Sequence, residues 1–295
     1  MVIGTLGQEW VFHLFSKFDR LFFGGKTAAA VQFFFRLIRT KLGLISWISV
    51  TSRGVATGEF GYDSELIGNV VTKKNQLYKI QMLNPNFMCP QSLVRPLIPL
   101  AYITHKHVRV LDFGGGGGTQ YFATSNLLSS SRVFDWRVIE TEAIVNQSTN
   151  LANDNLEFYK SIGEAISDGF SPDLVMASSS LEYTKNPMET LVELINLDAD
   201  YLYLTRSALT LEPDLITAEQ FTRLKDNGPG PLPDEFEDCE VNYWIRILPM
   251  SFVKEELSKN YEILFTSLEA EKILHIRDLS VNQYGILARR KKHDE

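Results

Sequence analysis

The sequence predicts an α/β protein in which a doubly wound sheet follows an N-terminal, mainly helical extension. Three observations carry this prediction. A short apolar run from Val108 to Phe113 ends in five consecutive glycines, Gly114 to Gly118. Beyond the glycines, segments typical of strands and of helices alternate, as an α/β fold requires. Before them, apolar residues recur at helical spacing. We therefore expect an extension over residues 1–105 and a sheet domain over residues 106–295.

The composition is that of a soluble globular protein and excludes several classes of function. The chain has 295 residues, of which 44% are hydrophobic and 22% charged, enough for a sizeable core. A net charge of −7 provides no basic field for phosphate backbones, so we expect no nucleic-acid partner. Cys89 and Cys239 are too few for a disulfide framework, and neither has metal-ligand spacing. We expect a cytoplasmic protein without a metal site.

The first 48 residues predict two amphipathic helices. Val11, Phe15 and Phe18 keep helical spacing, and a second helix is expected from about Ala28 to Ile48. Their uncharged runs are shorter than the ~18 residues that a membrane span needs. The helices could pack on the sheet domain, which we favour. Alternatively they could lie in a membrane interface with their aromatic side chains inward, which would make the protein peripheral at the inner membrane face.

Residues 51–105 predict a loop, one helix and a connection to the sheet. The stretch from Thr51 to Asp63 is rich in Gly, Thr and Ser, which favours a loop. A helical segment follows from Ser64 to Val71. Four prolines then interrupt the chain before the glycine-terminated strand.

The glycine turn is the place where the sequence predicts a bound ligand. A run of glycines after a buried strand permits positive φ and close approach of a ligand to the backbone. The dinucleotide fingerprint Gly-x-Gly-x-x-Gly fails in every register, because its last glycine falls on Thr119, Gln120 or Tyr121, or its first on Phe113. The pattern that does fit is acidic-x-Gly-x-Gly-x-Gly. Its members are Asp112, Gly114, Gly116 and Gly118.

This pattern resembles the first motif of the class I S-adenosylmethionine-dependent methyltransferases. The resemblance implies that the glycines face the methionine part of S-adenosyl-L-methionine. It also implies a Rossmann-like, seven-stranded, doubly wound sheet whose last strand is antiparallel. The chain is then expected to be an enzyme, with residues 106–295 as its methyltransferase domain.

The next two strands add candidate contacts to the nucleoside of the cofactor. Trp136 to Glu140 predicts a second strand that ends in a carboxylate. Because the carboxyl ends of neighbouring strands share one crevice, Glu140 is expected beside the glycine turn, where it could accept hydrogen bonds from both ribose hydroxyls. Leu156 to Ser161 predicts a third strand. Many family members carry an acidic residue after this strand for the adenine amino group, and here Ser161 or a backbone group would have to serve.

The fourth strand provides the candidate catalytic residues. Pro172 to Tyr183 contains it, and Asn186-Pro187 opens a helix through Ile195. The stretch resembles the fourth motif of the family, in which small residues leave space for the sulfonium. The residues expected near the cofactor are Ser178, Ser179 and Ser180. Glu182 is the candidate general base, and Tyr183 would orient the acceptor.

The rest of the chain predicts three strands, one helix and a loop over the site. Tyr201 to Thr205 is the fifth strand, and Arg206 after it suits an anionic acceptor. Asp226 to Asp234 forms a loop, and Tyr243 follows it. A helix from Ser251 to Leu257 precedes strands over residues 261–266 and 283–288. The segment before the first strand often forms part of a substrate lid in methyltransferases. The candidate substrate contacts are therefore Tyr62, Arg206 and Tyr243.

Two short motifs narrow the expected function. Gly61-Tyr62-Asp63 and the Ser-x-x-Leu-Glu-Tyr end of the fourth strand resemble an uncharacterised family of methyltransferases associated with bacterial surface-polysaccharide genes. The resemblance implies methyl transfer, chiefly to oxygen, on a small-molecule or sugar acceptor such as a glycan precursor. Two alternatives stay open. One is an NAD(P)-dependent oxidoreductase, and the other is a non-catalytic cofactor-binding scaffold that docks to a polysaccharide-biosynthesis complex through its N-terminal helices.

Overall fold

The computed structural model describes residues 47–49, 61–84, 86–276 and 279–292. The chain divides into two compact units, residues 1–47 and 48–295. The two predicted N-terminal helices lie outside the described residues except at their end, where Trp47–Ser49 forms the short strand β1, next to β7 in the sheet order. The helix predicted to reach Ile48 is therefore wrong at its last two residues. Aromatic and β-branched side chains suit a strand that has a sheet edge to pair with.

The central sheet has the predicted doubly wound order. Its strands are β2 (His107–Phe113), β3 (Val133–Ile139), β4 (Leu156–Tyr159), β5 (Leu174–Ser178), β6 (Tyr201–Thr210), β9 (Tyr261–Ile276) and β10 (Leu279–Arg290). The spatial order is β4-β3-β2-β5-β6-β10-β9, with β2 to β6 parallel and β10 antiparallel to β6 and β9. The chain reverses its direction of winding between β2 and β5, so the switch point of the sheet lies beside the glycine turn. A Rossmann-like sheet with an antiparallel last strand is confirmed.

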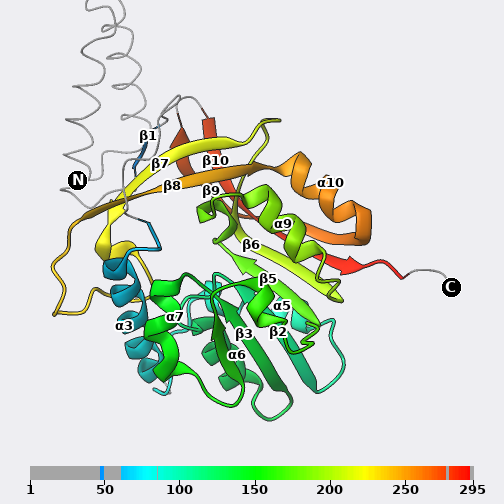
Figure 1. The fold of residues 1–295 in the computed structure, drawn as a ribbon, viewed down its shortest axis with the longest axis horizontal. Coiled ribbons are helices and arrows are strands. Elements are labelled where there is room, and N and C mark those ends of the chain that lie inside the picture. Colours follow the sequence, from blue (N-terminus) through cyan, green and yellow to red (C-terminus); the bar gives the residue numbers. More distant parts are fainter. Residues whose placement is uncertain (1–46, 50–60, 85, 277–278, 293–295) are drawn as a thin grey trace, which may run out of the picture. The chain divides into compact units, whose positions relative to one another are not determined.

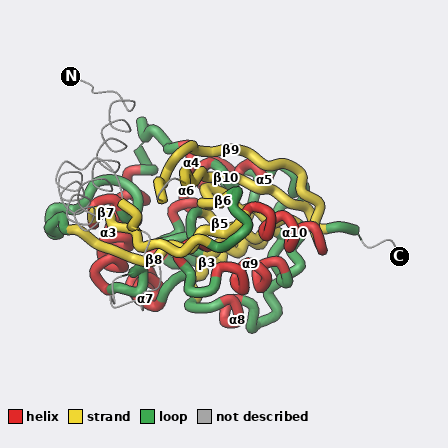
Figure 2. Tube along the Cα trace, turned by 90° about the horizontal axis from the view of Figure 1, so that it is seen from above, coloured by secondary structure: helices red, strands yellow, loops and turns green. Residues whose placement is uncertain are grey.

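Helices cover both faces of this sheet, which explains why the central strands β2, β3 and β5 bury apolar residues on both sides. The helices are α3 (Glu65–Gln81), α4 (Gln91–Val94), α5 (Leu97–Leu100), α6 (Thr119–Leu128), α7 (Glu142–Ser148), α8 (Ile162–Ala165), α9 (Pro187–Ile195) and α10 (Met250–Asn260). Successive strand residues enter opposite cores: Val110 packs with α5 and α6, and Leu111 packs with α9 and α10. In Figure 2, α4, α5 and α6 lie on one side of β5, and α8 and α9 lie on the other.

An antiparallel hairpin was not predicted and, together with β1, extends the described sheet to ten strands. It consists of β7 (Ile216–Arg223) and β8 (Glu240–Pro249), which cross the top of Figure 1 in yellow and orange. The end of β8 pairs in parallel with the end of β6, which runs to Thr210 rather than stopping at Thr205. No strand was assigned from the sequence between residues 206 and 250, although buried and less buried residues alternate along β8.

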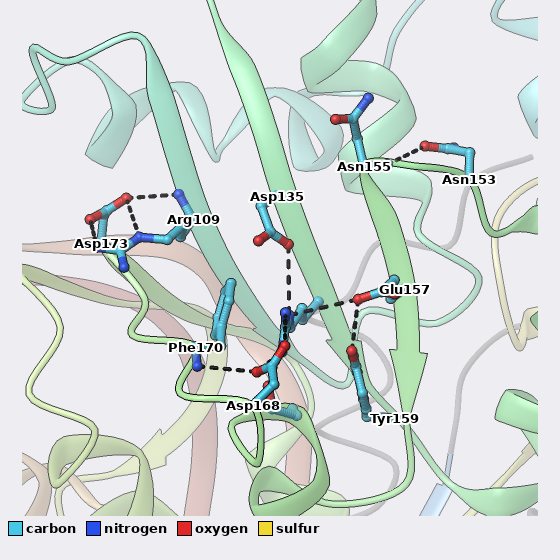
Figure 3. A network of polar contacts seen from close by, with 11 residues as sticks. Arg109, Asp135, Asn153, Asn155, Glu157, Tyr159, Asp168, Phe170 and Asp173 are labelled. Carbon is cyan, nitrogen blue, oxygen red and sulfur yellow. Dashed lines mark hydrogen bonds and ion pairs between the residues drawn. The ribbon is translucent and has the colours of Figure 1, made fainter.

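Polar side chains hold the connections of the sheet in place. Arg137 on β3 is buried, bonds both carboxylate oxygens of Asp168 at 2.8 Å, and donates to the backbone oxygen of Ala165 at 2.6 Å. Its guanidinium lies 4.0 Å from the centre of the Phe170 ring. Arg109 and Asp173 make a second pair between β2 and the start of β5 (Figure 3). These contacts fix the connection between α8 and β5 to the strands β2 and β3.

The predicted helix after the N-terminal loop is longer than expected. It starts one residue after Ser64, and α3 then continues to Gln81, ten residues beyond Val71. The extra turns contain Lys74 and Asn75, two buried polar residues that interrupt the apolar pattern. Among the described residues, no helix is long and apolar enough to cross a membrane.

Candidate functional site

The five glycines after β2 form a turn whose geometry matches the pattern acidic-x-Gly-x-Gly-x-Gly. Gly114, Gly116 and Gly118 have φ of 72°, 59° and 77°, values that residues with a side chain rarely adopt. Gly118 is the N-cap of α6. The two intervening glycines are required for space instead, since a Cβ at Gly115 would lie 2.5 Å from a carboxylate oxygen of Asp112.

Asp112 lies beneath this turn and is fully buried. Its Oδ2 accepts a hydrogen bond from the indole nitrogen of Trp136 at 3.2 Å, while its Oδ1 has no hydrogen-bond partner among the described residues. Burial raises the pKa of Asp112 to about 7, and the bond from Trp136 opposes this rise. A carboxylate held without a counter-ion favours a positively charged group nearby.

Glu140 follows β3 and reaches the glycine turn. Its Oε1 accepts from the backbone N–H of Gly116 at 2.9 Å and its Oε2 from that of Thr141 at 3.0 Å. Burial raises the pKa of Glu140, and the two backbone hydrogen bonds oppose the rise. One amide of the turn is therefore already paired with a carboxylate, and each carboxylate oxygen keeps capacity for a further donor.

The end of β5 lies directly against the turn. The hydroxyl of Ser180 donates to the backbone oxygen of Phe113 at 2.7 Å, and a Cβ at Gly114 would lie 2.2 Å from that of Ser180. Ser178 is buried, and its hydroxyl has no partner among the described residues. Ser179 adopts a φ of 52°, a backbone conformation that costs about 1–3 kcal/mol for a residue other than glycine.

Glu182 follows in the short 3-10 helix η2 (Leu181–Tyr183) and is 3% exposed. It accepts a hydrogen bond from the hydroxyl of Ser179 at 3.0 Å. Burial raises the pKa of Glu182 to about 7, although hydrogen bonds and the charge of Arg206 oppose the rise. An acid whose pKa lies near neutrality can accept a proton at physiological pH.

Three tyrosines from distant segments meet beside Glu182. The ring centres of Tyr62, Tyr183 and Tyr243 lie 5.1–5.3 Å from one another, which is typical of packed aromatic side chains. Burial raises the pKa of Tyr62 to about 12, and the charges of Glu140 and Glu182 contribute to the rise. Tyr62 therefore lies within electrostatic reach of both carboxylates.

Arg206 lies inside β6 rather than after it. Its φ is 52°, and its backbone N–H donates to Oε2 of Glu269 on β9 at 2.5 Å. The charge of Arg206 acts on Glu182, Tyr62 and Tyr183, so it belongs to the same cluster.

Ser161 is exposed, and its hydroxyl accepts from the backbone N–H of Glu164 at 3.2 Å as the N-cap of α8. The hydroxyl of Ser161 is thus already hydrogen-bonded to the first turn of α8. A contact from Ser161 to adenine stays a prediction.

Helix α3 covers the turn and connects it to the hairpin. The hydroxyl of Thr119 bonds Asn75 of α3, and that of Thr141 donates to the backbone oxygen of Tyr62 at 2.9 Å. Lys74 is buried and donates to the backbone oxygens of Lys225 and Asn227 at 2.5 and 2.8 Å, which fixes the loop before β8. The sequence reasoning missed these α3 residues. The apolar spacing of Ile67, Val70 and Val71 continued by Tyr78 was the available signal.

The predicted residues thus fall into two neighbouring groups. Asp112, the glycines and Glu140 surround the switch point, together with the serines that end β5. Glu182 and Arg206 lie with the three tyrosines under the hairpin. No group of three or more His, Cys, Asp or Glu side chains able to hold a metal ion occurs in the part of the chain that the structure describes.

Comparison with known families finds no matching family model, and comparison with curated proteins finds no match. Solved structures do resemble the chain. The CcbJ methyltransferase of Streptomyces caelestis is 11% identical, with a TM-score of 0.48, 78% of this chain and 100% of that one covered. The 1,6-didemethyltoxoflavin-N1-methyltransferase of Burkholderia thailandensis, solved with 1,6-didemethyltoxoflavin and S-adenosylhomocysteine, is 11% identical, with a TM-score of 0.45 and coverages of 83% and 95%. A methyltransferase of Aquifex aeolicus is 17% identical, with a TM-score of 0.40 and coverages of 75% and 98%.

These neighbours are methyltransferases, and structures among them were solved with S-adenosylmethionine or S-adenosylhomocysteine. Likeness at this level carries no conclusion about the reaction of this chain. The fold class follows instead from the strand order of the sheet, and the description of the site follows from the contacts of its side chains.

Proposed function

We propose that the chain is an S-adenosylmethionine-dependent methyltransferase, with residues 106–295 as its catalytic domain and residues 1–105 as an extension that contributes a substrate lid. The observation that carries this proposal is the charge around the glycine turn. Asp112 is buried, and its Oδ1 has no hydrogen-bond partner among the described residues. The backbone N–H of Gly116 already donates to the carboxylate of Glu140.

That charge distinguishes between the two cofactor classes. S-adenosylmethionine carries a sulfonium and an ammonium group, which the carboxylates of Asp112 and Glu140 would attract. The pyrophosphate of NAD(P) would need free backbone N–H groups and would instead meet two carboxylates at the turn. The residues present therefore fit S-adenosylmethionine better than a dinucleotide.

The same residues suggest how the cofactor would be held. Glu140 keeps acceptor capacity on both oxygens for the ribose hydroxyls. The glycines and Asp112 would face the methionine part, with Ser178 and Ser179 beside the sulfonium. Ser161 or the backbone next to it would meet the adenine. When bound, S-adenosylmethionine supplies the electrophilic methyl group.

The remaining residues would serve the acceptor. Holding an acceptor oxygen in line with the methyl group can contribute about 7–11 kcal/mol by positioning alone. Glu182 would accept the proton of the acceptor hydroxyl, which can add about 10²–10⁴ in rate. Tyr183 would orient the acceptor together with Tyr62 and Tyr243, and Arg206 would bind an anionic group on it.

We further propose a small-molecule or glycan-precursor acceptor, O-methylation and a role in surface-polysaccharide synthesis. Support for this finer assignment comes from the two short motifs around Tyr62 and Tyr183. A cytoplasmic location belongs to the same proposal, with contact of residues 1–48 at the inner membrane face as the alternative to their packing on the sheet domain. Flotation of the full chain with anionic vesicles tests the membrane contact, and recovery of the protein only in the unbound fraction would remove it.

A thermal-shift screen tests the proposed cofactor. A ligand that binds only the folded state raises its stability by about 2.7 kcal/mol at a concentration 100 times its Kd. S-adenosylmethionine and S-adenosylhomocysteine should both raise the unfolding temperature, and NAD⁺ and NADP⁺ should not. A saturable effect of NAD⁺ without one of S-adenosylmethionine would refute the proposal and favour an oxidoreductase.

A further inference from the structure

A buried ion pair lies behind β6, outside the residues assigned to cofactor or acceptor. Arg95, between α4 and α5, bonds Oε2 of Glu269 on β9, and their side chains are 14% and 7% exposed. Glu269 also accepts from the hydroxyl of Thr205 at 2.9 and 3.1 Å and from the N–H of Arg206 at 2.5 Å. A carboxylate removed this far from water needs such satisfied hydrogen bonds.

The chain makes room for this carboxylate. A Cβ at Gly285 of β10 would lie 2.5 Å from Oε1 of Glu269, so no larger residue fits there without displacing it. The register between β10 and β6 shifts at this glycine, between Tyr284 and Ile286. Irregularities of this kind beside a functional site re-aim the backbone of neighbouring strands.

Glu269 holds two strained residues in place. Arg206 has a φ of 52°, and its N–H ends on Glu269. Ser179, which directly follows the neighbouring strand β5, also has a φ of 52°, and its N–H donates to the backbone oxygen of Thr205 at 3.0 Å. Strained conformations persist only where their surroundings fix them, and here Glu269 bonds Arg206 directly and is linked to Ser179 through Thr205.

Two hydrogen-bonded residues, Thr205 and Ser179, link this carboxylate to Glu182. Glu269 bonds Thr205, whose backbone oxygen accepts from Ser179. The hydroxyl of Ser179 donates to Glu182 at 3.0 Å. We propose that Glu269 is a positioning residue, which fixes Arg206 directly and Glu182 through Thr205 and Ser179. The role of Glu182 and Arg206 toward an acceptor rests on the proposed function, whereas the hydrogen bonds that link them to Glu269 do not.

The test compares Glu269→Gln with Glu262→Gln in the ligand-free full chain. Glu262 is a matched control, because it lies on the same strand and makes an exposed ion pair with Arg289. The titration of Glu182 is followed by carboxyl-carbon NMR and assigned with Glu182→Gln. The charged and phenolic groups that act on Glu182 are Arg206, Tyr62 and Tyr183, and none of them is altered.

Positioning of Ser179 by Glu269 and a purely electrostatic effect of its charge predict opposite changes in the pKa of Glu182. If Glu269 positions Ser179, the bond from Ser179 weakens in Glu269→Gln and the pKa of Glu182 rises further. Loss of a negative charge alone would lower it. Amide exchange at Ser179 and Arg206 should increase about 10-fold or more, as expected for loss of a charge-assisted hydrogen bond. Neither change is expected in Glu262→Gln.

The proposal would be overturned if the pKa of Glu182 in Glu269→Gln were unchanged or lowered and the amide exchange of this variant equalled that of Glu262→Gln. Glu269→Gln removes the carboxylate partner of Arg95, which would keep only its hydrogen bond to the hydroxyl of Thr205, and could fail to fold. The double variant Arg95→Met/Glu269→Gln removes both charges, and the same changes at Glu182, Ser179 and Arg206 are expected. Since no cofactor is present, a negative ligand screen would remove the proposed function without affecting this result.

Discussion

Replacing Glu182 by glutamine removes a buried carboxylate whose ionisation destabilises the folded protein. Burial raises the pKa of Glu182 from 4.5 to about 7, so the folded protein binds this proton more tightly than the unfolded chain does. Stability from this group is complete below pH 4.5 and is lost as the pH rises through about 7. At about 1.4 kcal/mol per pKa unit, the loss above neutrality is about 3 kcal/mol.

We therefore expect Glu182→Gln to be more stable than the wild type at pH 8, by up to about 3 kcal/mol, and to have no such advantage near pH 4.5. Urea unfolding at the two pH values, followed by tryptophan fluorescence, measures the difference. Glu193→Gln is the control, because Glu193 is an exposed residue of α9. Equal effects of Glu182→Gln at both pH values would refute the reasoning. Once an acceptor is known, the same variant should lose about 100-fold in turnover.

Three further predictions concern the turn, the sheet and the cofactor. Gly118→Ala should destabilise by about 1–3 kcal/mol in urea unfolding, because its φ is 77° and the new Cβ would lie 2.9 Å from Leu156; Gly163→Ala, with no atom within 4 Å, should not. Arg137→Met should cost about 2–3 kcal/mol by the same assay, and a change below 0.5 would contradict the role of its buried hydrogen bonds. Affinity for S-adenosylmethionine should rise with pH through about 7, since a bound cation favours the ionised form of Asp112; calorimetry at pH 6 and 8 that finds equal Kd values would contradict this.

The central sheet could be predicted because its strands are buried on both faces. Val108 to Phe113 and Leu174 to Ser178 are mainly apolar, and a glycine or serine marks the turn at the end of each. The hairpin was missed although β8 alternates: Val241, Tyr243 and Ile245 are buried and the residues between them are not. Alternation of this kind is the signal of a strand with one solvated face.

The candidate site was predictable where its residues follow strands, since strand ends meet at one edge of a parallel sheet. Glu140 was expected beside the glycine turn on this ground, and it bonds Gly116. Contacts between residues far apart in sequence leave no such pattern. Lys74 holds a loop about 150 residues away, and Glu269 bonds Arg206 from a strand 63 residues later, so neither could be found before the chain was folded.

The claim that the glycine turn binds S-adenosylmethionine is tested most directly by calorimetric titration of the wild type, Glu140→Ala and Glu142→Ala. Glu142 is a suitable control, because it lies two residues away and its carboxylate forms an exposed ion pair with Lys160. Hydrogen bonds to a charged acceptor contribute about 1.5–3 kcal/mol each, so Glu140→Ala should weaken binding about 10-fold or more, and Glu142→Ala should bind like the wild type. Equal affinities of all three proteins for S-adenosylmethionine, or no binding to the wild type, would contradict the assignment.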